Sequence, residues 1–321
     1  MTPTVNNDID EEGVDLVYLW VNGNDPEWRA KRNAAIGETV STSAVNCDGR
    51  YADNDELRYS LRSVDLYAPW LHKIYIVTDN QVPEWLDTSN PKISIIDHKE
   101  IMPPESLPCF NSAVIEHFIC RIPGLKSRFL YANDDMCLNR PVTEETFFAP
   151  DGLPIIRQNR RLFRKWYLAF KEKVMGKKLS NYNRTVDNVA TLVENRFGSF
   201  YGGNANHNID SYRKEDCMHT EAIFEKEIAA TLCNHCRQDN DVQRSLYHYV
   251  ALAEHRGHRR YVSQKESLRI HIQNRSHYKK LENYNPLFFC MNDSEYANDE
   301  DRLYSARFLK KRFPEKSQFE K

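Results

Sequence analysis

Residues 128–141 read RFLYANDDMCLNRP, and this stretch decides how the rest of the chain is interpreted. The apolar run at 129–132 predicts a buried β-strand that ends abruptly at the adjacent carboxylates of Asp134 and Asp135. Two adjacent carboxylates at the end of a buried strand are costly to hold together unless a positive charge lies beside them. Ligands of open α/β sheets bind outside the carboxyl ends of the strands, where Mg²⁺ is held by one or two carboxylates and substrate phosphates. Asn-Asp-Asp is also good turn chemistry, so this stretch alone leaves a metal site and a turn as alternatives.

The bulk composition narrows the class of protein. The 321 residues are 40% hydrophobic, which is enough for one large domain, or for one domain with an appended helical part. There are 44 basic and 46 acidic residues, and a net charge of -2 does not indicate a nucleic-acid partner. The eight cysteines are too sparse for a disulfide scaffold. The first residues do not resemble a signal peptide and no run approaches the ~20 apolar residues of a membrane span, so we expect a cytoplasmic, reducing location.

The same pattern of an apolar strand followed by polar residues recurs along the first half of the chain. Runs at 14–21, 73–79 and 93–97 predict three more strands. Asn or Asp follows or ends each of them, and this repetition predicts a sheet with one functional edge. The first half therefore reads as an α/β core over 14–156, preceded by a disordered segment at 1–13. No GxGxxG or GxxxxGK[ST] motif is present, so neither a dinucleotide fingerprint nor a P-loop is predicted.

Helices are predicted between these strands, at 26–36, from about residue 53 and from 110 to 122, and a short one begins near residue 82. In the second helix, Asp53 or Asn54 is the expected N-cap. Arg58 and Arg62 lie four positions apart on a face away from its apolar stripe. Two guanidiniums in this arrangement suit a diphosphate, and a solvated helix face is the alternative.

Beyond Pro141 the pattern becomes mostly helical, and we expect residues 157–321 to complete the same catalytic domain. The stretch RRLFRKWYLAFKEKVMGKK at 160–178 is cationic with interleaved aromatic residues, which suits an anionic acceptor or a membrane surface, with a solvated helix face as the alternative. Cys233 and Cys236 resemble half of a zinc site that Cys217 and His219 would complete, although the chain has no second CxxC.

Four long segments together resemble the Stealth family, the sugar-1-phosphate transferases of bacterial capsules and cell-surface polysaccharides, which are related to GlcNAc-1-phosphotransferase. The segments are VDLVYLWVNGNDP (14–26), RYADNDELRYSLRSVDLYAPWLHKIYIVTDNQVPEWL (50–86), LPCFNSAVIEHFICRIPGLKSRFLYANDDM (107–136) and FPEKSQFE (313–320). The stretch around His207 and Arg237 resembles a further region of the family more loosely, because Asn208-Ile209-Asp210 stand where the family usually has prolines.

The resemblance implies a Rossmann-like, glycosyltransferase-A-like core with a mostly helical C-terminal half. It also implies a reaction in which an acceptor hydroxyl of a glycan attacks the phosphorus that bears the sugar of a UDP-sugar, so that UMP leaves and a phosphodiester forms. Location at the inner face of the membrane, with peripheral attachment, fits such a reaction. The alternatives are a metal-dependent glycosyltransferase that uses a UDP-sugar, and a sugar-nucleotide or glycan-binding protein without catalytic activity.

The resemblance also assigns roles to individual residues, because phosphoryl transfer depends on positioning and on neutralising charge. His207 is the expected acid/base on the acceptor hydroxyl, and an Asp of the 134–135 pair is the alternative base. Arg237 is the expected phosphate clamp, and Arg62 is a second candidate. Donor contacts are expected from Trp20, Asn22, Gly23, Asp25 and Asp79. The expected ligands of Mg²⁺ or Mn²⁺ are Asp135, Asp134, Glu116, Asn292 and Asp293.

Overall fold

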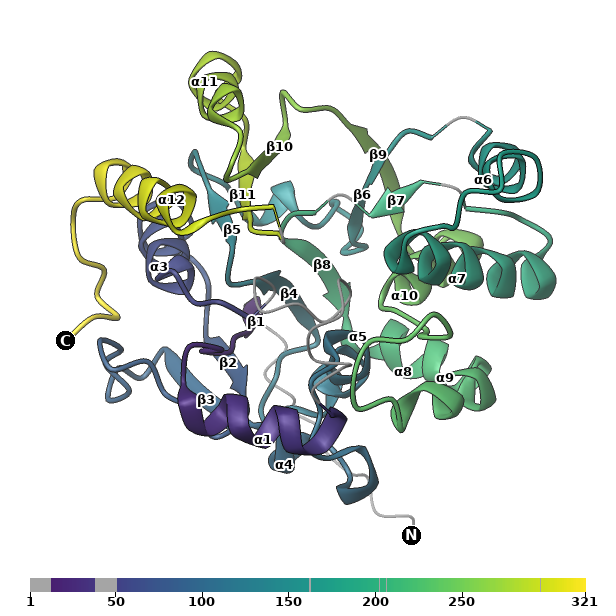
Figure 1. The fold of residues 1–321 in the computed structure, drawn as a ribbon, viewed down its shortest axis with the longest axis horizontal. Helices are drawn as coiled ribbons and strands as arrows, with labels where there is room; N and C mark the ends of the chain where they lie inside the picture. Colours follow the sequence, from purple (N-terminus) through teal and green to yellow (C-terminus); the bar gives the residue numbers. More distant parts are fainter. Residues whose placement is uncertain (1–12, 38–50, 162, 202, 206, 295) are drawn as a thin grey trace, which may run out of the picture.

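The computed structural model describes residues 13–37, 51–161, 163–201, 203–205, 207–294 and 296–321. Its centre is a five-stranded sheet in the order β3-β2-β1-β4-β8 (Figure 1). Strands β1 to β4 are parallel and β8 is antiparallel to β4. The order 3-2-1-4 is that of a doubly wound Rossmann sheet, so the predicted α/β, Rossmann-like core is confirmed. The strands are β1 Asp15–Leu19, β2 Ile74–Thr78, β3 Ile93–Asp97, β4 Arg128–Asn133 and β8 Asp210–Arg213.

Side chains of β1 alternate between two apolar layers, one on each face of the sheet. Leu16 and Tyr18 pack in one cluster with the apolar stripe of α3, while Val17 packs in the other with residues of α5. This alternation follows from the two-residue period of a strand, and burial on both faces explains why these strands are almost continuously apolar. The sheet is thereby held as a rigid layer between two sets of helices.

The helices on the first half of the chain begin where the sequence provides caps or prolines. The Asp25 side chain accepts hydrogen bonds from the backbone N–H groups of Glu27 and Trp28, and Pro26 occupies the first helical position of α1. Asn111 caps α5 in the same way. The helices of this half are α1 Pro26–Ile36, α3 Glu56–Tyr67, α4 His98–Ile101 and α5 Ser112–Ile115, with 3₁₀ helices η2 Pro104–Ser106, η3 Glu116–Arg121 and η4 Glu144–Thr146.

The second half is rich in helix, as predicted, and also contributes strands. Strand β8 completes the central sheet, so the two halves share one core. Two small sheets have the orders β10-β11-β5 and β7-β6-β9. Their strands are β5 Met136–Leu138, β6 Ile155–Asn159, β7 Asn204–Ala205, β9 His258–Val262, β10 Ser267–His271 and β11 Phe288–Asn292. The helices are α6 Arg164–Lys173, α7 Asn181–Phe197, α8 Lys214–Ile223, α9 Glu225–Leu232, α10 Ser245–Ala253, α11 Arg275–Tyr284 and α12 Asp299–Arg312.

Three local expectations were wrong. No helix begins at 82–86, because Leu86 forms a bridge with Glu320 and the backbone there pairs with the end of the chain. The helix expected over 110–122 is divided into α5 and η3. The N-cap of α3 is Asp55, in a left-handed conformation with φ 64°, because the Glu56 carboxylate accepts the bonds of Asn54 instead. The expected disorder of 1–13 falls almost entirely on residues outside the described part of the chain.

The expectations about zinc and membrane spans are also answered for the described residues. Cys217 lies in the core against Cys120. Among the described residues, one group of three or more His, Cys, Asp or Glu side chains is close enough to hold a metal ion, and it includes none of the four residues expected to bind zinc. Within the described ranges, the model has no helix with the length and apolar character that crossing a membrane requires.

Candidate active site

A pocket of about 260 Å³ lies at the carboxyl edge of the parallel strands. The residues that follow β1, β2 and β4 form one side of it, as expected for a ligand site in a doubly wound sheet. Residues from the second half of the chain close it from the other side. The polar and charged lining residues are Glu56, Asp79, His98, Ser112, Asn133, Asp134, Asp135, His207, Arg237, Asn292 and Asp293.

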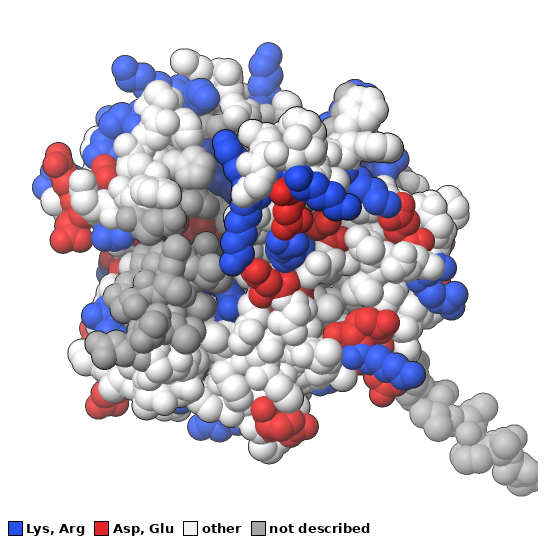
Figure 2. Space-filling view, turned by 45° about the vertical axis from the view of Figure 1, so that its right-hand side comes forward, with Lys and Arg blue, Asp and Glu red and all other residues white. Residues whose placement is uncertain are grey.

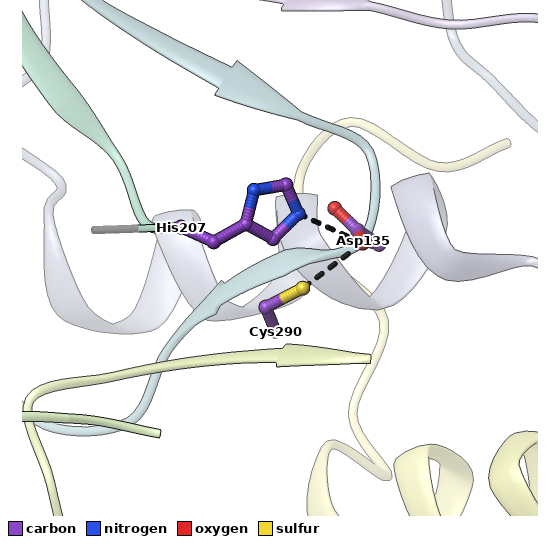
Figure 3. A group of neighbouring side chains, drawn as sticks. All are labelled: Asp135, His207 and Cys290. Atoms are coloured by element: carbon purple, nitrogen blue, oxygen red, sulfur yellow. Dashed lines mark hydrogen bonds and ion pairs between the residues drawn. The ribbon is translucent and has the colours of Figure 1, made fainter. Parts of the chain in front are cut away.

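Asp135 is the point at which the two sides of the pocket meet. Its Oδ2 accepts a hydrogen bond from Cys290 Sγ over 2.9 Å and lies 3.5 Å from His207 Nε2 (Figure 3). These three side chains come from the β4–β5 turn, from β11 and from the segment after β7. They form the only group in the described chain whose His, Cys and carboxylate atoms lie within metal-ligand reach of one another.

The surroundings of Asp135 favour the ionised form of its carboxyl group. Burial opposes its ionisation, but the neighbouring His207 and the Cys290 hydrogen bond outweigh it and hold the pKa of Asp135 below its usual range. Its other oxygen, Oδ1, is buried and finds no hydrogen-bond partner among the residues that the structure describes. A buried carboxylate oxygen without a partner is costly, so this atom is suited to binding a cation.

Asp134 belongs to a cluster of carboxyl groups on the other side of Asp135. Burial, together with the charges of Asp135, Glu56 and Asp53, raises the pKa of Asp134 well above its usual range. Burial likewise raises the pKa of Glu56 to about 8 and that of Asp53 to about 6. Neutralising this cluster requires either bound protons or a bound cation.

The donor set fits a divalent cation. The carboxylates of Asp134 and Asp135 and the amide of Asn292 offer the oxygen ligands that Mg²⁺ and Mn²⁺ prefer. The orphaned Oδ1 of Asp135 and the protonated state forced on Asp134 are both relieved when such an ion is present. His207 and Cys290 add two ligand types that softer metals favour, so the same place also has zinc-like character.

Strand β11 brings the C-terminal residues to this place. Its Met291 backbone N–H donates to the Asp135 carbonyl over 2.9 Å, and β11 pairs with β5 directly after the two aspartates. Asn292 and Asp293 follow and line the pocket. The Asp293 carboxylate is also bound by Arg302, whose Nε lies 2.8 Å from Oδ2, so its orientation is set by α12.

Arg237 is the single Lys or Arg among the described lining residues. Its Nη2 donates to Ser112 Oγ over 3.1 Å, and its guanidinium lies 5.9 Å from the centre of the Tyr51 ring. Ser112 is the first residue of α5 and also lines the pocket, so this contact fixes the guanidinium against the pocket wall. This arrangement suits a phosphate group.

The loop after β1 is built by mutual hydrogen bonds. The Gly23 N–H donates to the Tyr51 carbonyl over 2.7 Å, and a Cβ at Gly23 would lie 2.3 Å from that oxygen, so only glycine fits. The Asn22 N–H donates to Gln81 Oε1, and Gln81 donates back to the Asn22 carbonyl and to Asp25. Trp20 lines the pocket, whereas Asn22, Gly23 and Asp25 hold the loop beside it.

Asp79, which follows β2, also lines the pocket. Its two carboxylate oxygens accept hydrogen bonds from Lys31 Nζ over 2.6 and 2.8 Å. This contact joins the end of β2 to α1. The Asp79 side chain is therefore already neutralised by a lysine, which separates it from the carboxyl cluster around Asp134.

Glu116 was expected among the metal ligands, and the structure corrects this. Its Oε1 accepts from the Tyr131 hydroxyl over 2.9 Å and lies 3.5 Å from Arg244 Nε, in a small separate cavity. Arg244 also pairs with Asp210 at the start of β8. Because a buried carboxylate requires a compensating charge, Glu116 is held by this arginine away from Asp134 and Asp135.

Arg62 was expected to bind phosphate, and it does not reach the pocket. Its Nε lies 2.7 Å from Glu320 Oε1, its Nη1 donates to the Phe313 carbonyl, and Arg58 binds the same carboxylate. The two arginines lower the pKa of Glu320, which burial alone would raise, to about 2. They fasten the C-terminal segment FPEKSQFE to α3.

Several residues of the site were not identified from the sequence, among them Glu56 and Tyr51, which line the pocket, and Cys290, which binds Asp135. Asp53 was interpreted as a candidate N-cap, and Glu56 follows it in the first turn, where acidic residues are common. A signal was present, since Glu56, Ser60 and Ser63 recur with helical spacing on the buried face of α3. No local feature distinguished Cys290 as a partner of Asp135.

Comparison with known proteins identifies two regions of this chain. The family model described as "Stealth protein CR1, conserved region 1" matches residues 12–39, and "Stealth protein CR2, conserved region 2" matches residues 50–156. All of the pocket residues contributed by the first half of the chain lie within these two matches.

Similar proteins are named exopolysaccharide phosphotransferases. The chain is 32% identical over 329 residues to "Exopolysaccharide phosphotransferase CpsY" of Mycobacterium tuberculosis, which covers 96% of this chain and 58% of that protein. It is 49% identical over 141 residues to "Exopolysaccharide phosphotransferase cps2G" of Lactiplantibacillus plantarum, covering 44% of this chain and 41% of that protein. The chain thus spans less than two thirds of the length of these relatives. Among solved structures, the galactosyltransferase LgtC is similar with a TM-score of 0.44 at 11% identity, covering 94% of this chain and 95% of that one.

Proposed function

Because the chain belongs to the Stealth family, whose conserved regions 1 and 2 it carries, we propose that it is a sugar-1-phosphate transferase of polysaccharide synthesis. It transfers a hexose-1-phosphate, such as GlcNAc-1-phosphate, from a UDP-sugar to a hydroxyl of a glycan acceptor. The observation that supports this best is the meeting of Asp135, His207 and Arg237 in one pocket at the carboxyl edge of the sheet.

In the proposed reaction, the acceptor oxygen attacks the phosphorus that bears the sugar. A new P–O bond forms, the P–O bond to UMP breaks, and the bond at the sugar's anomeric carbon is untouched. Little covalent chemistry is required of the protein, because positioning and charge neutralisation account for most of the catalysis of phosphoryl transfer. A pocket lined by Arg237, His207 and a carboxylate cluster offers both.

The carboxylates of Asp134 and Asp135, with Asn292 and Asp293 beside them, would hold Mg²⁺ or Mn²⁺. When bound, such an ion offsets the charge of the phosphates and of the leaving UMP. Arg237 binds a phosphate oxygen, since its guanidinium is fixed by Ser112 and lies beside Tyr51. Trp20 and Asp79 line the part of the pocket that receives the donor.

His207 takes the proton of the attacking hydroxyl. Its Nε2 lies 3.5 Å from Asp135 Oδ2, so the positive charge that forms on the imidazole is stabilised by the carboxylate. Asp134, which lines the same pocket, is the alternative base. Substitution of each residue separates the two assignments.

The test is a panel of UDP-sugars with Mg²⁺ and an acceptor oligosaccharide, followed by mass spectrometry and phosphorus-31 NMR. The proposal expects UMP, an acceptor heavier by a hexose phosphate, and a phosphodiester signal. Release of UDP with a glycosidic product would instead identify a glycosyltransferase. Binding of UDP-sugars without turnover of any acceptor would indicate a binding protein.

A further inference from the structure

Helix α6 presents apolar side chains to solvent, in the reverse of the usual arrangement. The exposed fraction is 79% for Trp166 and 53% for Phe170, while Arg164 and Leu168 face inward at 6% and 5%. Most of these exposed residues recur every three or four positions and therefore lie on one side of the helix. We define this α6 stripe as Phe163, Trp166, Tyr167, Phe170, Val174 and Met175, all at least 47% exposed.

Cationic side chains surround the α6 stripe. Residues 160–178 contain eight Lys or Arg and one Glu, in a chain whose net charge is -2. Of the eight, Arg164 is buried and Lys165 pairs with Glu194 of α7, which leaves six. That single Glu172 is paired with Arg184 of α7, so it does not offset the surrounding charge at the surface. Arg161 precedes the stripe, and Lys173, Lys177 and Lys178 lie at its other end, all exposed. Figure 2, which brings the α6–α7 side of the molecule forward, shows Lys and Arg side chains beside uncharged surface on this face, with Asp and Glu side chains between some of them.

We propose that the α6 stripe docks on the surface of an anionic lipid bilayer. Trp and Tyr are favoured at the boundary between headgroups and acyl chains because they combine an apolar ring with a polar group. The Phe, Val and Met side chains gain from insertion below the headgroups, and the flanking cations are attracted to anionic lipids. Both features are needed, since neither weak apolar insertion nor charge alone gives stable attachment.

The shape and charge of the α6 stripe argue against other occupants. A helix of ten residues is about 15 Å long, whereas a stable protein interface buries ~800 Å² on each partner and is about 30 Å across. Docking of two copies through this stripe would also bring two strongly cationic segments together. An anionic glycan would explain the cations, but it would gain nothing from the exposed Phe170, Val174 and Met175.

The experiment measures co-sedimentation of the full chain with vesicles, without any donor sugar. One set of vesicles is phosphatidylcholine, and the other is phosphatidylcholine and phosphatidylglycerol in equal parts. We expect at least ~10-fold tighter binding to the anionic vesicles, weakened by salt. The variant Trp166→Ser/Phe170→Ser and the variant Lys177→Glu/Lys178→Glu should each lose at least ~10-fold of that affinity.

Matched controls lie on α12, which is on the opposite side of the molecule from α6 (Figure 1). Lys310→Glu/Lys311→Glu makes the same change in net charge, and Leu303→Ser removes a side chain that is 51% exposed. Both should bind vesicles as the parent chain does. Equal loss in the controls, equal binding to both vesicle types, or no vesicle binding would overturn the proposal. Self-association abolished by Trp166→Ser, or binding to an acidic polysaccharide in place of vesicles, would overturn it in favour of that partner. Circular dichroism of each variant verifies that it is folded.

Discussion

Cys290 and Asp135, which are 155 positions apart, are joined by a hydrogen bond of 2.9 Å from the thiol to the carboxylate. The backbone N–H of Met291 also binds the Asp135 carbonyl, so β11 holds both the main chain and the side chain of this residue. The orientation of the buried Oδ1, and with it the ability to bind a cation, therefore depends on the C-terminal half of the chain. This contact explains why a pocket built at the edge of the first-half sheet requires the second half.

Asp135→Asn should lower kcat/KM for a UDP-sugar at least ~100-fold, because an amide of the same size cannot supply the charge. The measurement is UMP release as a function of Mg²⁺ concentration. Asp151→Asn, at an exposed carboxylate that does not line the pocket, is the matched control and should leave the rate unchanged. Parent-like turnover of Asp135→Asn would show that Asp135 has no role in the reaction.

Cys290→Ala should weaken Mg²⁺ binding by about 10-fold, since residues that orient a ligand contribute 10- to 100-fold to metal affinity. Cys290→Ser restores a donor to Asp135 Oδ2 and should recover most of that loss. The readout is the Mg²⁺ concentration at half-maximal rate, together with calorimetric binding. If Ala and Ser behave alike, the thiol contributes packing and does not position Asp135.

His207→Ala should lower kcat more than it raises KM for the donor, because a proton acceptor acts in the transition state. Asp134→Asn is measured beside it under saturating Mg²⁺. Retention of the parent rate by His207→Ala would exclude the histidine as base. Because Asp134 is also a proposed metal ligand, the role of base passes to it only if Asp134→Asn then loses the rate while it binds Mg²⁺ as the parent chain does. Stopped-flow measurement of the first turnover separates the chemical step from product release.

The stability of the metal-free protein should fall as the pH rises from about 4.5 to about 8. Burial raises the pKa of Glu56 from 4.5 to about 8, so over this range the folded state holds a proton that the unfolded state releases. The stabilisation is complete below pH 4.5 and is lost as the pH passes through 8, on the order of 5 kcal/mol. Urea unfolding across this range, with Glu56→Gln as the comparison, measures the effect. Glu56→Gln should reduce the slope, and the remainder is expected from Asp134 and Asp53, whose pKa values burial also raises. An unchanged slope would show that Glu56 does not contribute.

Arg62→Ala should reduce the free energy of unfolding by about 3 kcal/mol and leave KM for the donor unchanged. It removes one partner of Glu320, whose side chain is 0% exposed. Breaking a buried ion pair costs about 3–5 kcal/mol, and the lower end is expected because Arg58 still pairs with the same carboxylate. Lys310→Ala, at an exposed position, is the control for stability. A raised KM with unchanged stability would instead indicate that Arg62 binds the donor. Because the pKa of Glu320 is lowered to about 2, its contribution is present above pH 4.5 and is lost as the pH falls towards 2.

Much of the architecture was predictable because its signals are local. The apolar run at 93–97 is β3 Ile93–Asp97, and the segment at 26–36 is α1 Pro26–Ile36. These agree because strand periodicity, a capping aspartate and a proline act within a few residues. Where an expectation failed, at 82–86, a distant segment had replaced the local hydrogen bonds, since Leu86 bridges to Glu320.

The sequence by itself determined the parallel strands of the core and the polar edge at which they end, including Asp134 and Asp135. Only the tertiary structure decided which charged groups reach that edge. Arg62 and Glu116 were reasonable candidates, but Glu320 and Arg244 bind them elsewhere, while His207 and Cys290 arrive beside Asp135. The physical reason is that a buried charge must be paired, and its partner is set by how β8, β11 and the C-terminal segment pack, which the spacing of residues along the chain does not encode.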